Sequence, residues 1–188
     1  MSITLVCYIL PVGEWEPRFF IYVYMKIIFL ILALATFFFN PFLSLFLVFL
    51  LAWVQTNQIQ GSPLQQKFLA GAIPAVMPDG FYKGSVDFYH DGWRGKKFVA
   101  SEQRGVNVFT KFGQDTDAYP FKTYVGPALR DHGLEVLKID YQAPGVPFYV
   151  RPILDEIVEV EPGKFLGKIH YRLIPWFPFA IGYFWLEK

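Results

Sequence analysis

The sequence has no charged residue between Lys26 and Lys67. Within that gap, residues 27–54 consist almost entirely of Ile, Leu, Phe, Val, Ala and Trp. A soluble domain does not need so long an apolar run, whereas crossing the hydrocarbon core of a bilayer takes about 20 such residues. We therefore predict a transmembrane anchor at residues 25–55, preceded by an N-terminal tail at residues 1–24.

The chain also has little cysteine and no long basic cluster. Cys7 is its single cysteine, which excludes an intramolecular disulfide and a cysteine-based metal site. Its 17 Lys and Arg residues nearly balance its 16 Asp and Glu residues. Nucleic-acid binding by counterion release requires clustered basic residues, so we predict no nucleic-acid partner.

Catalytic and cofactor motifs are absent as well. There is no Gly-x-Ser-x-Gly elbow and no phosphate-binding glycine spacing, and none of the three histidines has metal-ligand spacing to another His or Cys. His90-Asp91 could form a base with its orienting carboxylate, but adjacent residues on a strand point to opposite faces. His132 falls in a turn signal, and His170 alternates outward with Lys168. We predict no cofactor and no metal, and we favour a protein that is not an enzyme.

Four acidic residues gather on one expected strand. They read best as an outward edge that resists strand pairing, and paired carboxylates doing acid–base work are the weaker interpretation; the four are Asp155, Glu156, Glu159 and Glu161.

The anchor can be built in more than one way, because Asn40-Pro41 interrupts it and proline disrupts a helix interior. We favour one helix over residues 27–54, kinked at Pro41, over a hairpin of residues 19–39 and 42–54. Ala33-Leu34-Ala35 has the form of a signal-peptide cleavage site, but cleavage would leave residues 37–54 exposed. Translation from Met25 rather than Met1 stays open.

Topology follows from the few charges that flank the anchor. Arg18 and Lys26 precede it, so the positive-inside rule places the N-terminus in the cytoplasm. The chain is then a single-pass membrane protein whose C-terminal domain lies on the non-cytoplasmic side, and a hairpin would reverse that conclusion.

The rest of the chain is typical of antiparallel strands. A linker with a short helix is expected at residues 56–77, and residues 78–188 carry period-two runs broken by Gly, Pro and Asp. Six to eight short strands predict a mainly β domain, a small antiparallel barrel or a strongly curved sheet. Pro162-Gly163 suits a type II turn, so residues 153–160 and 165–173 should form a hairpin with a positive φ at Gly163.

Two glycine-rich segments carry a family resemblance. Gly80-Phe81-Tyr82-Lys83-Gly84 is followed by Gly92-Trp93-Arg94-Gly95-Lys96-Lys97-Phe98, and residues 137–141, 152–155 and 165–168 continue the pattern. Residues 78–188 thus resemble the GXWXG-type domain proteins, a family of unknown function, with Tyr82 in place of the signature Trp. The opening strand is also similar to that of calycin barrels, which carry apolar ligands. That resemblance implies that Tyr82 plugs the barrel end and that Arg172 stacks on it.

A small barrel can enclose one small ligand. We predict a membrane-anchored binding module for an apolar ligand such as a lipid. The alternatives are a structural accessory subunit of a membrane protein complex, held partly by the aromatic residues 175–185, and a lipid-modifying enzyme that uses His90 or Asp155. The predicted ligand-binding residues alternate along the strands or lie near the barrel's mouth or closed end; they are Tyr82, Phe88, Trp93, Val108, Ile139, Ile169, Tyr171 and Arg172.

Overall fold

The computed structural model describes residues 30–34, 37, 40–86, 92–174 and 177–188. The chain divides into two units, residues 1–51 and 52–188. The predicted N-terminal tail with Cys7, as well as Phe88 and His90, lies outside the described residues.

Helix α2, Pro41–Gln60, is the apolar element of the chain. Proline suits the first turn of a helix because its missing N–H would have no partner there. Asn40 caps the helix, since its Oδ1 accepts a hydrogen bond from the Leu43 N–H at 3.1 Å. By length and composition α2 is apolar enough to cross a membrane, as the sequence predicts. It continues past the predicted end of the anchor at residue 55.

The start of the apolar run differs from a single helix over residues 27–54. Residues 30–34 are helical, but Asn40 is not. The Ser44 Oγ donates to the Ala33 carbonyl oxygen at 2.8 Å. Residues so far apart along a straight helix would be separated by roughly 16 Å. The chain therefore turns back before Pro41, which is closer to the hairpin alternative.

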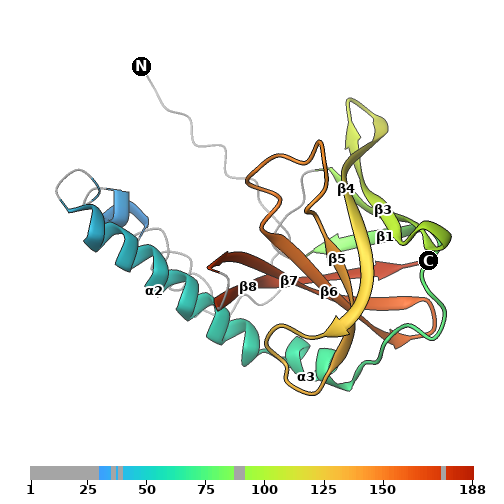
Figure 1. Ribbon diagram of the computed structural model, residues 1–188, viewed down its shortest axis with the longest axis horizontal. Helices are drawn as coiled ribbons and strands as arrows, with labels where there is room; N and C mark the ends of the chain where they lie inside the picture. Colours follow the sequence, from blue (N-terminus) through green and yellow to red (C-terminus); the bar gives the residue numbers. More distant parts are fainter. Residues whose placement is uncertain (1–29, 35–36, 38–39, 87–91, 175–176) are drawn as a thin grey trace, which may run out of the picture. The chain divides into compact units, whose positions relative to one another are not determined.

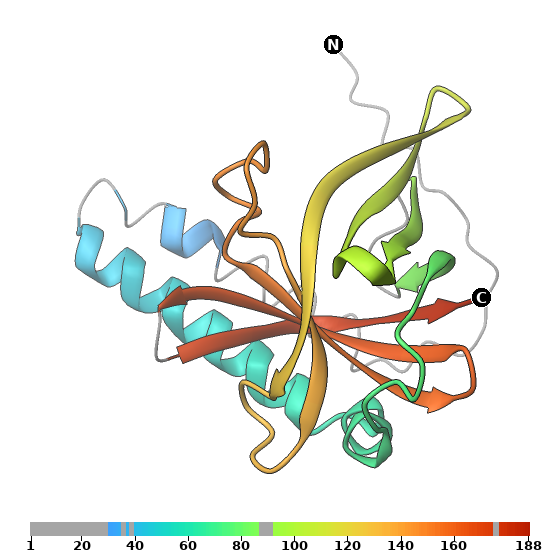
Figure 2. The ribbon, with the colours of Figure 1, turned by 45° about the vertical axis from the view of Figure 1, so that its right-hand side comes forward.

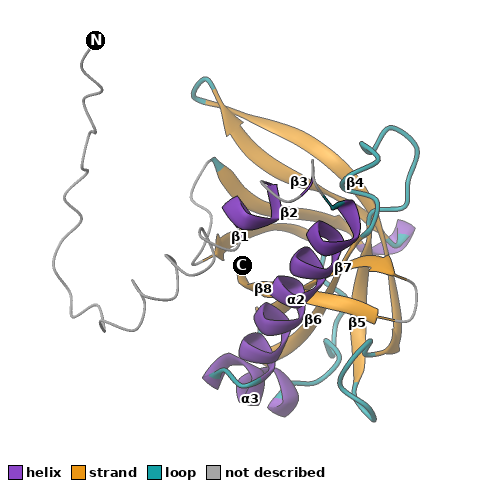
Figure 3. Ribbon diagram, turned by 90° about the vertical axis from the view of Figure 1, so that its left-hand side faces the viewer, coloured by secondary structure: helices purple, strands orange, loops and turns teal. Residues whose placement is uncertain are grey.

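The second unit is built on a closed antiparallel barrel of eight strands in sequential order, as the sequence predicts (Figures 1 and 3). Closure removes every sheet edge, so the predicted acidic edge on the sixth strand does not exist. The strands are β1 (Gly80–Val86), β2 (Trp93–Val99), β3 (Arg104–Lys111), β4 (Gln114–Pro127), β5 (Glu135–Asp140), β6 (Ile153–Glu161), β7 (Lys164–Ile174) and β8 (Phe177–Glu187), with a 3-10 turn, η1 (Ala100–Glu102).

The predicted hairpin is confirmed. β6 pairs antiparallel with β7, with Asp155 opposite Ile169, and Gly163 in the turn has a φ of 74°. Only glycine adopts such a backbone conformation readily, which explains its place after Pro162.

One end of the barrel is closed by aromatic side chains. Tyr82 packs edge-on against Phe98 and Phe165, with ring centroids 5.7 and 5.3 Å apart. Phe98 continues the series to Phe121 at 5.4 Å. All four rings are buried, and they fill the part of the interior near the start of β1.

Helices cover part of the outer face. Helix α3, Pro63–Ala70, begins at Ser62, whose Oγ accepts a hydrogen bond from the Gln65 N–H. Phe68 of α3 and Ile59 of α2 pack on Val158 and Leu166, which point outward from β6 and β7. Part of the outer face is therefore covered by helices and apolar, and Figure 3 shows α3 and the end of α2 lying against the barrel.

Candidate functional site

A cavity of about 200 Å³ lies inside the barrel, beyond the aromatic plug. Its walls come from the end of β1, the start of β2 and the connection between β5 and β6, so it faces the end of the barrel opposite the plug. Apolar side chains make most of the wall, and four polar ones converge at one side. The lining residues are Val86, Trp93, Lys96, Asn107, Tyr119, Tyr141, Val150, Ile153, Asp155, Ile169 and Phe184.

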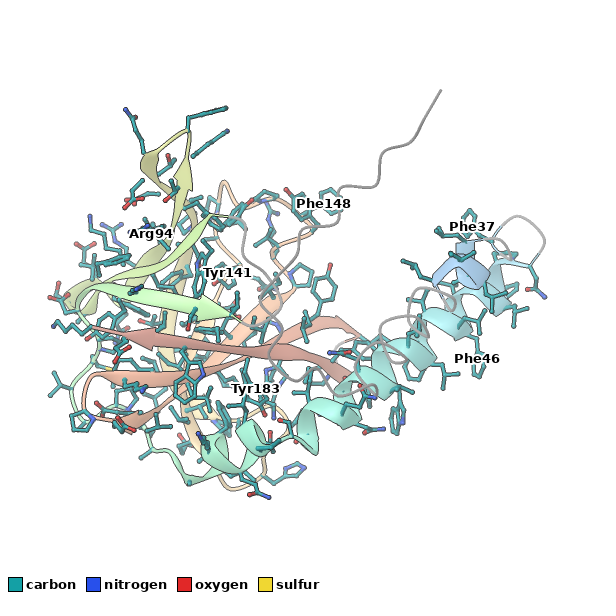
Figure 4. The ribbon with its side chains drawn as sticks, turned by 180° about the vertical axis from the view of Figure 1, so that it is seen from behind. Phe37, Phe46, Arg94, Tyr141, Phe148 and Tyr183 are labelled. Atoms are coloured by element: carbon teal, nitrogen blue, oxygen red, sulfur yellow. The ribbon has the colours of Figure 1, made fainter. Side chains whose placement is uncertain are left out.

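The polar group centres on the buried Lys96 ammonium. Lys96 Nζ lies 2.9 Å from Asp155 Oδ2 and 2.9 Å from Asn107 Oδ1, and it also donates to the Tyr141 hydroxyl. Tyr141 in turn donates to Asp155 Oδ2 at 2.9 Å. Lys96, Asp155, Asn107 and Tyr141 thus form one connected cluster, with Tyr141 inside the barrel (Figure 4).

The cluster uses nearly all of its own hydrogen-bonding capacity. The three protons of Lys96 have three acceptors, and the Asn107 amide group donates to the Tyr119 carbonyl and the Tyr141 hydroxyl. The exception is Asp155 Oδ1, which forms no hydrogen bond to any residue that the structure describes. This oxygen is the acceptor that the cluster leaves open beside the cavity.

Burial dominates the electrostatics here. It lowers the pKa of Lys96, against the opposing attraction of Asp155, and it raises the pKa of Tyr141 well above its usual value, with the Asp155 charge adding to the rise. Tyr141 therefore stays protonated at neutral pH and keeps its hydrogen bond to Asp155. The ion pair makes the cavity nearly neutral overall, which disfavours a charged ligand.

Glycines leave the space that the Trp93 ring occupies. That ring packs edge-on against Phe184 with centroids 5.8 Å apart. A Cβ on Gly84 would lie 2.4 Å from that ring, and a Cβ on Gly95 would lie 2.0 Å from the Tyr82 carbonyl oxygen. The spacing of the two glycine-rich segments thus brings β1 and β2 close enough for Trp93 to line the cavity.

Phe88 lies outside the described residues, and the other seven predicted site residues separate into four groups. Trp93 and Ile169 line the cavity. Tyr82 and Ile139 belong to the filled core instead. Tyr171 points inward near the opening, where its hydroxyl donates to the Tyr149 carbonyl oxygen at 3.3 Å.

Two of the predicted residues do not face the interior. Val108 lies on the outer face, because its neighbour Asn107 points into the cavity. Arg172 also points outward, where its Nη2 lies 2.9 Å from Asp140 Oδ1. The cation over the Tyr82 ring is Lys188, 5.6 Å from the centroid, so the expected stacking of Arg172 on Tyr82 is wrong.

The sequence patterns do not single out Lys96 or Asn107, and they placed Asp155 on the outward acidic edge or, in the weaker interpretation, in an enzyme site. No local signal placed Asp155 inside the barrel. A turn at Pro162-Gly163 alone would pair it with the outward-facing His170, but a bulge between Glu159 and Glu161 shifts the register by one residue and pairs Asp155 with the inward-facing Ile169. Lys96 carries a weak signal, since it lies two residues before the apolar Phe98 and therefore on the same face of β2.

A second polar cluster lies outside the barrel, beneath α3. Lys168 Nζ is 2.8 Å from Asp131 Oδ2 and 2.8 Å from Gln65 Oε1, and Gln65 Nε2 donates to Asp131 Oδ1 at 2.7 Å. Tyr183 donates to the same Gln65 Oε1 at 2.5 Å (Figure 4). These contacts hold α3 and the β4–β5 connection on the outer face.

His170 and Glu156 sit beside that cluster, fully buried. His170 was predicted to be a surface residue, but the covering helices and connections remove it from solvent. Burial, together with Lys168 and other nearby cations, lowers the pKa of His170 to about 3, so its 3.7 Å approach to Glu156 Oε2 is not an ion pair at neutral pH. Glu156 Oε1 accepts from the Leu129 N–H at 2.7 Å, and burial raises the pKa of Glu156 to about 6.

We expect Glu156→Gln to stabilise the chain increasingly as the pH rises. The raised pKa means that the folded state binds a proton at Glu156 more tightly than the unfolded state does. This difference contributes fully to the free energy of unfolding below pH 4.5, and the contribution is lost as the pH rises through about 6. Relative to wild type, the variant should therefore gain about 2 kcal/mol in free energy of unfolding between pH 4.5 and pH 7.5. Denaturant titration of both proteins at the two pH values measures this difference. Both proteins contain His170, so the effect of its titration is the same in each and drops out of the comparison. A difference that does not change with pH would contradict the assignment.

Comparisons with known proteins add little to this geometry. The sequence matches no protein-family model and no curated protein. A crystal structure of a protein from Thermomonospora curvata is similar over 63% of this chain and 79% of that chain, with 17% sequence identity and a TM-score of 0.46. The resemblance to the GXWXG-type domain proteins stays a prediction.

Proposed function

We propose that the chain is a membrane-tethered binding protein that holds an apolar molecule, such as a lipid or part of one, inside its barrel. The observation that carries the proposal is the cavity beyond the plug, with its apolar walls and one convergent polar cluster. Ligand sites are typically built this way, because apolar walls supply affinity and a few polar groups fix orientation. The apolar residues before Ala52, including the first part of α2, supply the tether to a bilayer.

The size of the cavity limits what enters it. An apolar cavity of about 150 Å³ binds benzene, and this one measures about 200 Å³. It accommodates a ring-sized molecule or one end of a longer chain, but not a whole membrane lipid. A longer ligand must leave its remainder in the opening.

The free oxygen of Asp155 indicates which polar group the ligand carries. Every donor of Lys96 and Asn107 is already used inside the cluster, whereas Asp155 Oδ1 is an open acceptor. Because Asp155 borders the cavity, a ligand group that donates to this oxygen gains a hydrogen bond to a charged acceptor. The matching ligand is therefore a neutral molecule with a hydroxyl or N–H group, such as an alcohol.

The same bonding favours binding over catalysis. A catalytic lysine must offer a free amine or a mobile proton, yet Lys96 is held as an ion pair with Asp155 and directed at two further acceptors. The lipid-modifying enzyme remains the weaker alternative.

We expect phenol to bind the full chain about tenfold more tightly than benzene, because its hydroxyl can donate to a charged acceptor. The full chain in phosphatidylcholine nanodiscs is titrated with each compound, and the methyl NMR signals of Val86 and Val150 report occupancy. Ile169→Trp fills the cavity and should abolish both responses. Val76→Trp, on an exposed side chain, is the matched control and should leave them intact.

Equal affinity for the two compounds would contradict the role of Asp155, and no response to either would contradict the binding function. Solvent extraction of the purified chain followed by mass spectrometry then identifies the natural occupant. A large stable assembly on native gels that yields no extracted molecule would favour the structural-subunit alternative.

A further inference from the structure

Exposed aromatic side chains gather at one end of the barrel. Among the described residues of the second unit, the aromatic side chains that are more than half exposed are Phe112, Phe148 and Tyr149, at 96%, 81% and 54%. Phe112 lies in the β3–β4 turn, and the other two lie in the β5–β6 connection. The alternating strand directions put both connections at the end that the cavity faces (Figure 2).

The chain enters the second unit at that same end. Trp53 stacks on Phe177, the first residue of β8, with centroids 5.2 Å apart. Further along the chain, the Ala180 N–H donates to Thr56 Oγ1 at 3.1 Å. The part of α2 that belongs to the second unit therefore begins at the opening end and runs alongside β8 away from it.

We propose that Phe112, Phe148 and Tyr149 form a docking rim that rests on the lipid bilayer, so that the cavity opens toward the membrane surface. This inference rests on the proposed tether and deepens the proposed function, because it makes the bilayer the source of the ligand. Figure 4 shows Phe148 on the connection beyond Tyr141, pointing outward.

Two features favour a bilayer over a protein partner as the occupant. Phe and Tyr at the tips of connections insert readily among lipid headgroups, where aromatic rings are enriched. The tether also keeps the rim at a high local concentration of lipid, so that a few side chains suffice. Exposed charges of both signs lie at this end of the barrel: Arg94, Lys111 and Arg151 are basic, and Asp115 and Asp117 are acidic. We therefore expect the docking to depend little on salt.

The test places a fluorophore at the rim of the full chain in vesicles. Single cysteines are introduced as Phe112→Cys or Phe148→Cys in a Cys7→Ser background and labelled with bimane. The matched control is Val76→Cys, because Val76 is 80% exposed and precedes the start of β1 at the opposite end. The vesicles contain phosphatidylcholine with bromines near the headgroup end of the acyl chains.

We expect at least twofold quenching of the two rim labels by the brominated lipid, at low and at high salt, with the Val76→Cys label unchanged. Equal quenching at all three positions overturns the docking. A rim signal that depends on protein concentration but not on bromine indicates a second copy and overturns it too. Phenol binding measured on the same samples separates the two ideas. Phenol binding without quenching would contradict the docking alone. Quenching without phenol binding would contradict the ligand site alone. A chain that does not stay with the vesicles would contradict the tether.

Discussion

Replacing Lys96 by methionine will destabilise the chain by about 3–5 kcal/mol at neutral pH. Methionine fills most of the lysine's space but leaves the Asp155 carboxylate without its counter-charge, which lies 2.9 Å away in the native protein. A buried unpaired carboxylate is among the most costly defects that a single substitution can create. Denaturant titration of the full chain in detergent micelles measures the loss.

The neighbouring residue offers a matched control. Lys97 is exposed on the outer face of the same strand, so Lys97→Met should change the free energy of unfolding by less than about 0.5 kcal/mol. Adding Asp155→Asn to Lys96→Met should recover much of the loss, because it removes the unpaired charge. Equal stability of Lys96→Met and Lys97→Met would show that the ion pair does not hold the interior together.

The barrel could be predicted from the sequence because turns and strand periods are local signals. Pro162-Gly163 identified one hairpin, and the β7 positions 165, 169 and 171 face inward as expected. The start of the apolar run was less accessible, because Asn40-Pro41 is compatible with both a kink and a turn. The contact between Ser44 and Ala33 that distinguishes them is tertiary.

The cavity was harder to predict because the interior is partly polar and the outer face partly apolar. On β6, the even spacing of the apolar residues Leu154, Val158 and Val160 predicts one core face, but the interior face carries Asp155 and Ile157 instead. The same inversion occurs on β3, where Asn107 points inward and Val108 outward. Hydrophobic alternation assigns faces correctly only where one face meets solvent. On β6 the outer face is covered by α3 and the end of α2, whereas on β3 the reversal follows from the polar residue that the interior accepts.

Gly95→Ala will destabilise the chain by roughly 2–6 kcal/mol, because it combines backbone strain with a clash in the barrel wall. Gly95 has a φ of 139°, a conformation that other residues rarely adopt, and its added Cβ would lie 2.0 Å from the Tyr82 carbonyl oxygen. The atom that it meets belongs to the backbone, so a side-chain rotation cannot relieve the contact. β1 would separate from β2, and Trp93 would no longer be held in position beside the cavity.

Two further glycines test that explanation. A Cβ on Gly126 in β4 would lie 3.7 Å from its nearest neighbour, the Lys138 side chain, so Gly126→Ala should be nearly neutral. Gly113 has a φ of 79° with open space around it, so Gly113→Ala isolates the backbone strain and should cost about 1–2 kcal/mol. If Gly95→Ala costs no more than Gly113→Ala, the close approach of β1 to β2 is not what this position requires. If it costs more and phenol binding is lost with it, the glycine spacing that brings Trp93 to the cavity wall is also what forms the binding site.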